Sequence, residues 1–299
     1  MVNAEYRFAP ALKTSTPSLS ESVDAQGVTV YPASNHHLAL VRRGNTLDCL
    51  IDKKAKIGKN VSFGHGVRVY GNVEIGDNCD IGDFCVIGYP TARADSPPLK
   101  LGAGAIVRTH SVIYQGSEIG PFLETGHHVV IREGASIGEN LRVGNFSDIE
   151  GACQIGDFVR MHGYAHVGRG AKIGDFVWLF SLTTVMNDPL PPSHLSAPVT
   201  IGDMVTVCVN AQLMPGTMVG NGVLIASGAV ASGDIPAGVV ISGSDGDIAG
   251  QVRFLMHMES RTRHPWHKHF ADAYPERARS RIEALGAAID AEAANVNDL

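Results

Sequence analysis

The sequence predicts an all-β protein in which short parallel strands wind into a β-helix, and two observations lead to this prediction. Glycine supplies 34 of 299 residues, about 11%, against a usual value of about 7%. Hydrophobic residues reach 44% while aromatic residues stay at 6%, so the core is aliphatic and turns are frequent, unlike a helical bundle. The second observation is an aliphatic residue at nearly every sixth position, a period typical of hexapeptide β-helices.

The six-residue period is unbroken from Leu101 to Val185. Fourteen of the fifteen residues at this spacing are aliphatic, and Thr125 is the exception. The residue two positions earlier is small or apolar, and a separation of two places both side chains on one face of a strand. Three hexads therefore close one triangular coil of 18 residues. Coils stacked about 4.8 Å apart predict a prism of about ten coils over residues 49–245.

Two insertions interrupt the period, near residues 88–100 and 186–198. Both follow the third strand of a coil, so we expect two loops on the same edge of the prism, about 24 Å apart. Loops that interrupt a regular scaffold often carry function. Residues 1–48 are expected to be an irregular segment with one strand near Val28–Tyr31. Residues 246–299 leave the period and predict a tail with a helix at about 276–294.

Charge and composition exclude several classes of protein. Lys and Arg number 24 against 30 Asp and Glu, a formal net charge of −6, and no long basic run points to nucleic acid. No stretch approaches about 18 consecutive apolar residues, so no membrane span is expected. The N-terminus lacks the apolar core of a secretory signal. The five cysteines have no zinc-site spacing, and we expect a reduced, cytoplasmic chain with Cys79, Cys85 and Cys153 in the core.

Residues 18 positions apart stack on adjacent coils, so the repeat predicts contacts directly. His127 is expected between Thr109 and Asn145, and Glu124 beside Arg142. Histidine, with an unperturbed pKa of about 6.5, can accept a proton at neutral pH, and a neighbouring carboxylate can orient it or bind an amine. Two structural alternatives stay open: a simple Glu124–Arg142 ion pair and a solvated His127.

A second candidate pair is Asp148 with His166, which the same spacing places on adjacent coils. A carboxylate–imidazole pair can hold a proton or a polar substrate group. A plain surface ion pair is the alternative, and such pairs contribute little to stability.

These hexads resemble those of the left-handed β-helix acyltransferase family. Residues 122–133 (FLETGHHVVIRE) look like the active-site segment of its nucleotide-linked amino-sugar N-acyltransferases. Residues 145–151 (NFSDIEG) and 185–193 (VMNDPLPPS) look like the neighbouring and loop motifs of that group. Residues 264–275 are similar to a tail in some members. The resemblance covers roughly residues 50–275.

The resemblance implies a left-handed prism and a homotrimer with sites in clefts between subunits. It implies transfer of an acyl group, expected to be acetyl, from acetyl-CoA or another acyl-CoA to the amine of a nucleotide-linked amino sugar in glycan biosynthesis, without a metal. His127 would accept the proton and Glu124 would contact or orient the amine. The implied substrate-binding residues are Asn145, Asp148, Glu150, His166 and Asn187. The residues implied to face CoA are Asn210, Ala211, Ala226 and Ser227.

The sequence departs from that family at the C-terminal end of the prism. Many members carry a Lys before an Asp-x-Pro turn and a Gly-Asn-Pro-Ala-Lys segment, whereas residues 231–236 here read ASGDIP and residues 243–247 read GSDGD. CoA phosphates prefer Arg or Lys, so either the tail replaces these groups or CoA binding is weak or absent. The basic residues available in the tail are Arg253, Arg261, Arg263 and Lys268.

Other function classes stay open. A metalloenzyme similar to the carbonic anhydrases of this fold would use three histidines across a subunit interface, and the chain has 13. However, His162 and His166 lack the spacing of that family's paired ligands. A non-catalytic scaffold or sugar-binding subunit is favoured by the missing basic positions and opposed by the Glu124–His128 segment. A hydroxyl acceptor in place of the amine is a further variant.

Overall fold

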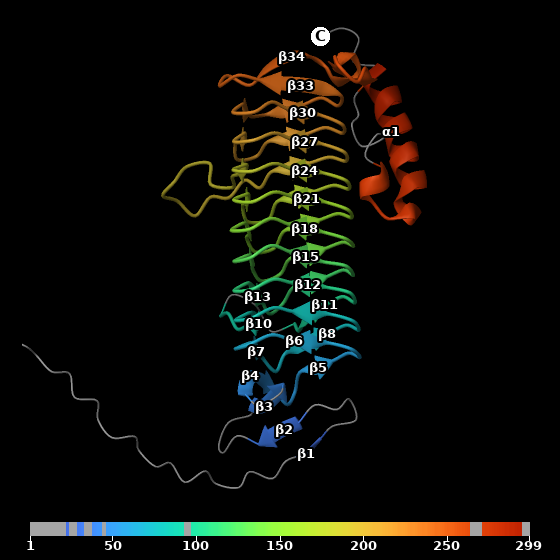
Figure 1. The fold of residues 1–299 in the computed structure, drawn as a ribbon. Helices are drawn as coiled ribbons and strands as arrows, with labels where there is room; N and C mark the ends of the chain where they lie inside the picture. The colour runs from blue at the N-terminus through green and yellow to red at the C-terminus, as the bar shows by residue number, and fades with distance from the viewer. Residues whose placement is uncertain are drawn as a thin grey trace, which may run out of the picture.

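The chain winds into a triangular prism built from three parallel sheets (Figure 1). The structure, a computed structural model, describes residues 49–92, 97–263 and 271–294, and the backbone alone of strands within residues 22–48. Successive strands of one sheet lie 18 residues apart in the regular coils, so that Ile119 pairs with Ile137. The predicted left-handed parallel β-helix of about ten coils is confirmed.

Each coil contributes one strand to each sheet, and the sheets are named A, B and C in chain order. Sheet A contains β4 (Thr46–Asp52), β7 (Arg68–Val69), β10 (Val86–Tyr89), β13 (Val112–Tyr114), β16 (Val130–Ile131), β19 (Asp148–Ile149), β22 (His166–Val167), β25 (Thr184–Val185), β28 (Gln212–Leu213) and β31 (Val230–Ala231). Sheet B contains β5 (Lys56–Ile57), β8 (Val73–Ile75), β11 (Leu99–Leu101), β14 (Glu118–Ile119), β17 (Ser136–Ile137), β20 (Gln154–Ile155), β23 (Lys172–Ile173), β26 (Thr200–Ile201), β29 (Met218–Val219) and β32 (Asp234–Ile235). Sheet C contains β6 (Ser62–Phe63), β9 (Asp80–Ile81), β12 (Ile106–Val107), β15 (Glu124–Thr125), β18 (Arg142–Val143), β21 (Arg160–Met161), β24 (Trp178–Leu179), β27 (Thr206–Val207), β30 (Leu224–Ile225) and β33 (Val239–Ser242).

Antiparallel strands cover sheet A at the first end of the prism and sheet C at the last. Before the first coil, β1 (Ser22–Val23), β2 (Thr29–Pro32) and β3 (Leu38–Arg43) pair antiparallel in sequence, and β3 pairs antiparallel with β4. Residues 1–48 were expected to be irregular apart from one strand, and the structure has these additional strands there. After the last coil, β34 (Asp247–Gln251) pairs antiparallel with β33.

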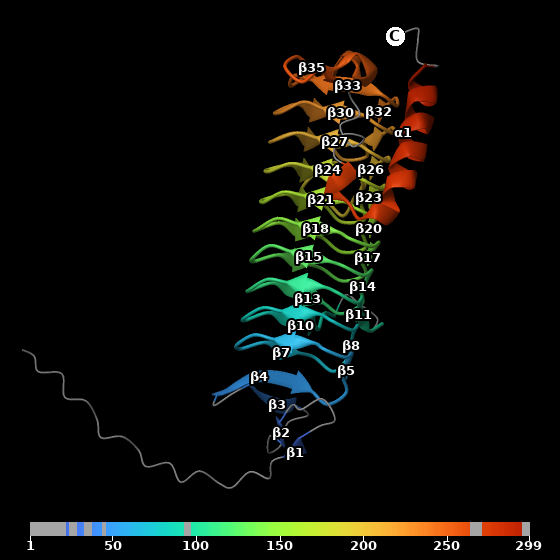
Figure 2. The same cartoon turned by 45° about the vertical axis from the view of Figure 1, so that its right-hand side comes forward.

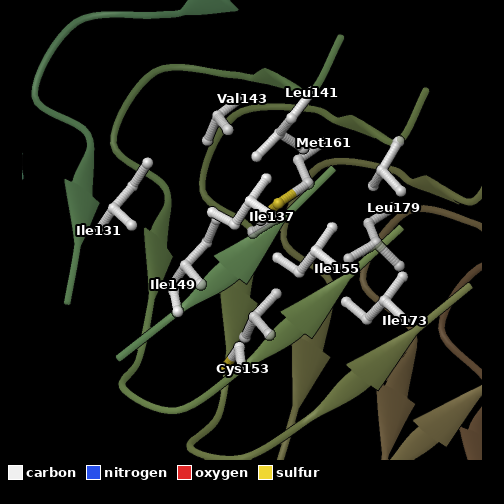
Figure 3. Packing of buried hydrophobic residues seen from close by; sticks show 14 of the residues in the cluster. Ile131, Ile137, Leu141, Val143, Ile149, Cys153, Ile155, Met161, Ile173 and Leu179 are labelled. Atoms are coloured by element: carbon white, nitrogen blue, oxygen red, sulfur yellow. The ribbon is translucent and has the colours of Figure 1, made fainter. Parts of the chain in front are cut away.

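The core is a continuous column of inward aliphatic side chains, drawn in part in Figure 3. Ile131 and Ile149 point inward from sheet A, Ile137 from sheet B and Val143 from sheet C, each at most 5% exposed. Because each strand supplies only two inward residues, a six-residue period is enough to fill the prism.

The three inward cysteines lie in this core as predicted. Burial raises the pKa of the Cys79 thiol, and raises the pKa of the Cys85 and Cys153 thiols to about 11. Thiols of that kind are structural groups without nucleophilic reactivity at neutral pH.

The two insertions both connect sheet A to sheet B, between β10 and β11 and between β25 and β26. The second extends from the side of the prism in Figure 1.

The tail runs along a different corner from the insertions, the one between sheets B and C. After the short hairpin β35 (Met256–His257) and β36 (Thr262–Arg263), it forms two 3-10 turns, η3 (Ala271–Ala273) and η4 (Glu276–Ala278), and the helix α1 (Arg279–Ala294), which lies along the prism (Figure 2).

The helix is held by apolar contacts and by charge. Corner residues Phe158, Phe176 and Met204 are buried against Tyr274, Ala278, Ile282 and Ile289. Arg281 pairs with both Asp157 and Asp175, and Arg277 pairs with Glu139 at 2.7 Å. The tail therefore covers one corner of the prism and reaches the neighbouring edge of sheet C.

Candidate functional site

The polar residues singled out in the sequence flank the corner between sheets C and A, except Asn187, which lies at the corner between sheets A and B. On the outer face of sheet C, one column of residues reads Glu124, Arg142, Arg160 and Trp178 over four coils. The next column, beside the corner, reads Arg108, Gly126, Gly144, His162 and Phe180. We call these two columns the sheet C face.

Glu124 lies between two arginines. Its carboxylate pairs with Arg108 at 2.8 Å and with Arg142 at 3.2 Å. The hydrogen bond from Arg108 holds the pKa of Glu124 below its usual value, and the charges of Arg142 and Arg108 act in the same direction against burial. The expected neighbour Arg142 is present, whereas Arg108 was not predicted. A carboxylate held in this way anchors two guanidinium groups and stays charged.

Thr125 explains the position of Arg108. Its side chain is fully buried, and its hydroxyl accepts the backbone N–H of Arg108 at 2.9 Å. The Thr125 carbonyl instead accepts the Arg108 guanidinium at 2.6 Å. In the next coil the equivalent backbone bond is the ordinary one, from Gly126 to the carbonyl of Val143. The one polar residue in the aliphatic series thus redirects a strand hydrogen bond and fixes an arginine.

His127 occupies the corner itself and is exposed. Its Nδ1 lies 2.8 Å from the Thr109 hydroxyl, and its backbone N–H donates to the Asn145 side-chain oxygen at 2.8 Å. This is the predicted Thr109–His127–Asn145 stack. Among the described residues, no hydrogen bond or ion pair joins His127 to Glu124. Holding Nδ1 leaves Nε2 as the nitrogen that can exchange a proton with a ligand.

The second predicted pair lies on sheet A, across the corner. His166 Nδ1 is 2.8 Å from Asp148 Oδ2. The hydrogen bond with Asp148 raises the pKa of His166 above its usual value, opposed by burial and helped by the charge of Glu150. Glu150 is half-buried and directly follows β19, two residues after Asp148. The structure therefore places these three residues on one face.

Asn187 begins the long insertion between sheets A and B. Its side-chain oxygen accepts the Arg169 backbone N–H at 3.1 Å, and its amide donates to Asp188 at 2.9 Å. Beneath it, the nearly buried Glu133 pairs with Arg132 at 3.1 Å and with Arg169 at 3.4 Å. Burial acts to raise the pKa of Glu133, but its backbone contact and the arginines outweigh it and hold the pKa low.

This cluster was missed from the sequence. Its only signal is the stack Glu133–Gly151–Arg169, in which a Cβ at Gly151 would lie 2.5 Å from Arg169 Nη1. The absence of a side chain there allows residues two coils apart to meet.

The residues expected near CoA lie further along the same C–A corner. Asn210 has a left-handed backbone, with φ of 58°, and Ser227 is exposed. The Ala211 side chain is buried in the core, so a ligand could contact only its backbone, and Ala226 is partly buried. Of the basic tail residues, Arg253, Arg261 and Arg263 lie after β33, and Lys268 lies outside the described residues.

The upper part of the sheet C face is aromatic. The rings of His162 and Phe180 stack with centroids 4.5 Å apart, and Trp178 lies 5.7 Å from Phe180 and 5.9 Å from His162. Trp178 Nε1 donates to the Tyr274 hydroxyl at 2.6 Å. Burial lowers the pKa of His162. This arrangement depends on the tail, which no periodicity places against sheet C.

Arg160 lies beneath the tail and is only 5% exposed. Its guanidinium is 4.8 Å from the Tyr274 ring centroid and donates to the Asn140 carbonyl and the Asn140 side-chain oxygen. Burial lowers its pKa to about 10.

The described residues contain no group of three or more His, Cys, Asp or Glu placed to hold a metal ion. Within the same part of the chain, no helix has the length and apolar character needed to cross a membrane.

Part of the repeat matches a known protein family. Residues 54–89 match the bacterial transferase hexapeptide family, which is described by six repeats. These residues carry the hexapeptide repeat of that family. This confirms the repeat predicted from the sequence.

The chain is 39% identical over 62 residues to 2,3,4,5-tetrahydropyridine-2,6-dicarboxylate N-acetyltransferase from Staphylococcus aureus. The match covers 21% of this chain and spans about a quarter of the length of that relative.

Solved structures are similar at lower identity. UDP-N-acetylglucosamine acyltransferase from Arabidopsis is 17% identical, with a TM-score of 0.40, and the alignment covers 81% of this chain and 93% of that one. The Campylobacter jejuni UDP-N-acetylglucosamine acyltransferase is 14% identical, with a TM-score of 0.35, over 78% of this chain and 72% of that one.

Proposed function

We propose that the protein transfers an acyl group, expected to be acetyl, from acyl-CoA to the amine of a nucleotide-linked amino sugar. The observation that carries this proposal is His127, an exposed corner histidine whose Nδ1 is held by Thr109 and whose backbone is held by Asn145. This geometry presents Nε2 as a proton acceptor on a rigid scaffold. The name of the N-acetyltransferase relative is consistent with acyl transfer to an amine.

The proposed reaction needs one proton acceptor and two bound reactants. The amine nitrogen attacks the thioester carbonyl carbon, an N–C bond forms, and the C–S bond breaks with departure of the CoA thiolate. His127 Nε2 takes the proton that the amine loses and returns it to the thiolate or to water. Asn145, Asp148, Glu150 and His166 border the sugar side of the corner. Asn187 lies at the A–B corner of its own chain, so in this proposal it contributes from the loop of a neighbouring subunit. Asn210 and Ser227, with the backbone of Ala211 and Ala226, border the CoA side.

Glu124 acts through the arginines in this proposal. Because its carboxylate already pairs with Arg108 and Arg142, it positions these two groups and does not itself take the proton. A homotrimer is part of the proposal, since a neighbouring subunit would close the exposed corner around the reactants.

The direct test is an acyl-transfer assay on purified protein of measured oligomeric state. Acetyl-CoA is incubated with a panel of nucleotide-linked amino sugars, release of the CoA thiol is followed, and the product is identified by mass. Turnover with an amino sugar, and none with its hydroxyl counterpart, supports the proposal. Turnover of the hydroxyl compound alone would change the acceptor class. Absence of turnover, with no acetyl-CoA binding up to millimolar concentration by calorimetry, would favour a non-catalytic scaffold.

A further inference from the structure

The sheet C face carries charge that the proton-transfer step does not use. Three guanidinium groups, from Arg108, Arg142 and Arg160, surround one carboxylate, that of Glu124. Two positive charges therefore remain in excess on a short stretch of an otherwise acidic chain. The patch is bounded by Ile106 on one side and Thr206 on the other. Its size fits a small dianion better than a polymer.

The arginines differ in how they are held. Arg142 uses one nitrogen for Glu124 and is half-exposed, and within the described part of the chain it has no other carboxylate partner. Arg160 is buried, and among the described residues its guanidinium donates only to neutral oxygens, those of Asn140 and Val159. A buried cation without a carboxylate in contact raises the local potential, and an anionic ligand would compensate it.

The aromatic part of the same face begins one coil beyond Arg142. His162, Trp178 and Phe180 are each partly exposed, and Tyr274 fixes the Trp178 indole by accepting its N–H. In four other coils the position of His162 and Phe180 is glycine, at Gly64, Gly82, Gly126 and Gly144. The chain thus has aromatic rings at two positions where those four coils have no side chain. Flat exposed rings beside arginines are what a nucleobase and its phosphates bind.

The distance along the prism axis between the arginines and the aromatic rings would let one ligand contact both. Phe180 lies two coils from Arg142, about 9.6 Å along the prism axis. His127 lies one coil below Arg142, next to the corner. An extended nucleotide with its base on the rings and its phosphates at the arginines would therefore direct a sugar on the terminal phosphate toward His127.

We propose that the sheet C face binds a nucleoside diphosphate, with the base against His162, Trp178 and Phe180 and the phosphates at Arg108 and Arg142. This rests on the proposed function for the direction of the sugar, but the binding itself does not. Two compounds of the proposed reaction carry this chemistry: the nucleotide-linked sugar and the adenosine diphosphate part of CoA. The test separates them.

The experiment uses Trp178 as its reporter. The chain has two tryptophans, so Trp266→Phe leaves Trp178 alone. UDP and 3′-phosphoadenosine 5′-diphosphate, the nucleotide part of CoA, are titrated separately into this variant, and its fluorescence and the heat of binding are recorded. Saturable quenching by UDP assigns the site to the sugar substrate. Saturable quenching by the adenosine compound alone assigns it to CoA. Both outcomes support a nucleoside diphosphate site.

Two further variants test the named contacts. Phe180→Ala and Arg142→Gln should each weaken binding of the quenching nucleotide about tenfold or more, by loss of stacking or of a phosphate partner. Only Arg142→Gln should also reduce the salt dependence of binding. Lys172→Gln, on the outer face of sheet B, is the matched control and should bind as the parent does. Circular dichroism and thermal melts verify that each variant is folded.

The inference is overturned if neither nucleotide quenches Trp178 up to millimolar concentration, or if Phe180→Ala and Arg142→Gln bind as well as the parent. Because binding is measured without turnover, these outcomes are independent of the acyl-transfer assay. Nucleotide binding without acyl transfer would reject the proposed function and keep the site. Acyl transfer without nucleotide binding on this face would do the opposite.

Discussion

Sheets B and C are built from the same hexads, yet their outer faces differ. On sheet B, the column beside the B–C corner is glycine in every coil from β5 to β29: Gly58, Gly76, Gly102, Gly120, Gly138, Gly156, Gly174, Gly202 and Gly220. The other column has exposed ladders such as Lys56–Glu74 and Lys100–Glu118. On sheet C, Arg108, His162 and Phe180 replace glycine in the equivalent column. Sheet B keeps the repeat throughout, whereas the charged and aromatic groups of the sheet C face stand where the repeat is broken.

Concavity is a poor guide here. Sheet B carries two open depressions of about 680 and 550 Å³, lined by residues such as Gly102, Glu118, Gly156 and Lys172. These residues are the ordinary repeat, and their charges are paired along the ladder or solvated. The sheet C face is the better candidate because its groups break the pattern and converge on one corner.

The largest expected effect is on turnover. His127→Asn should lower kcat of the proposed acyl transfer about 10²- to 10⁴-fold, because the proton acceptor is lost. Steady-state kinetics with acetyl-CoA measure it, and Lys172→Gln on sheet B should keep parental rates. Asn is shorter than His, so circular dichroism must show the same fold. Parental turnover in folded His127→Asn would remove this residue from the mechanism.

The next largest effect is on stability, and it compares a glycine of sheet B with a sheet C position where the chain already departs from glycine. A Cβ at Gly120 would lie 2.6 Å from the Gly138 carbonyl oxygen. Gly120→Val should therefore destabilise the fold by about 2–3 kcal/mol, measured by chemical denaturation. His162→Gly on sheet C restores the repeat and should cost less. Equal losses would show that the two columns are constrained alike.

A smaller effect should follow from Thr125→Val. The change restores the aliphatic series and removes the hydroxyl that accepts the Arg108 backbone N–H. We expect unfolding free energy to change by less than about 1.5 kcal/mol, while nucleotide binding on the sheet C face weakens several-fold because Arg108 is released. Parallel denaturation and nucleotide titration measure the two effects. Unchanged binding would mean that Thr125 does not position Arg108 for a ligand.

The smallest effect concerns pH. The pKa of His166 is raised in the folded protein, so its pair with Asp148 contributes stability that is full below the unfolded pKa of about 6.5 and is lost as pH rises through the folded value. Both side chains are more than a third exposed, so the contribution stays under about 1 kcal/mol. Asp148→Asn should therefore cost more stability at about pH 5.5 than at about pH 8.5. A cost that is independent of pH would contradict this pairing.

The period of 18 made part of the site predictable. The stacks Thr109–His127–Asn145 and Asp148–His166 are contacts between equal positions of adjacent coils, so counting along the chain finds them. The Arg108–Glu124 pair escapes the count because a long side chain crosses diagonally between columns. Trp178 and Tyr274 are 96 residues apart in the sequence. Their contact depends on how the tail packs against the prism, and the repeat period does not predict it.

The antiparallel strands at the two ends of the prism set a limit on growth. A stack of parallel coils has no intrinsic last member, and each terminal coil would offer free backbone groups to a coil of another molecule. At one end β3 turns against β4, and at the other β34 turns against β33, so sheet A at the first end and sheet C at the second do not finish on a parallel strand. The strands β3 and β34 thus cover strand edges that would otherwise be free to pair with another molecule. Shortening the chain at either end would favour end-to-end fibres.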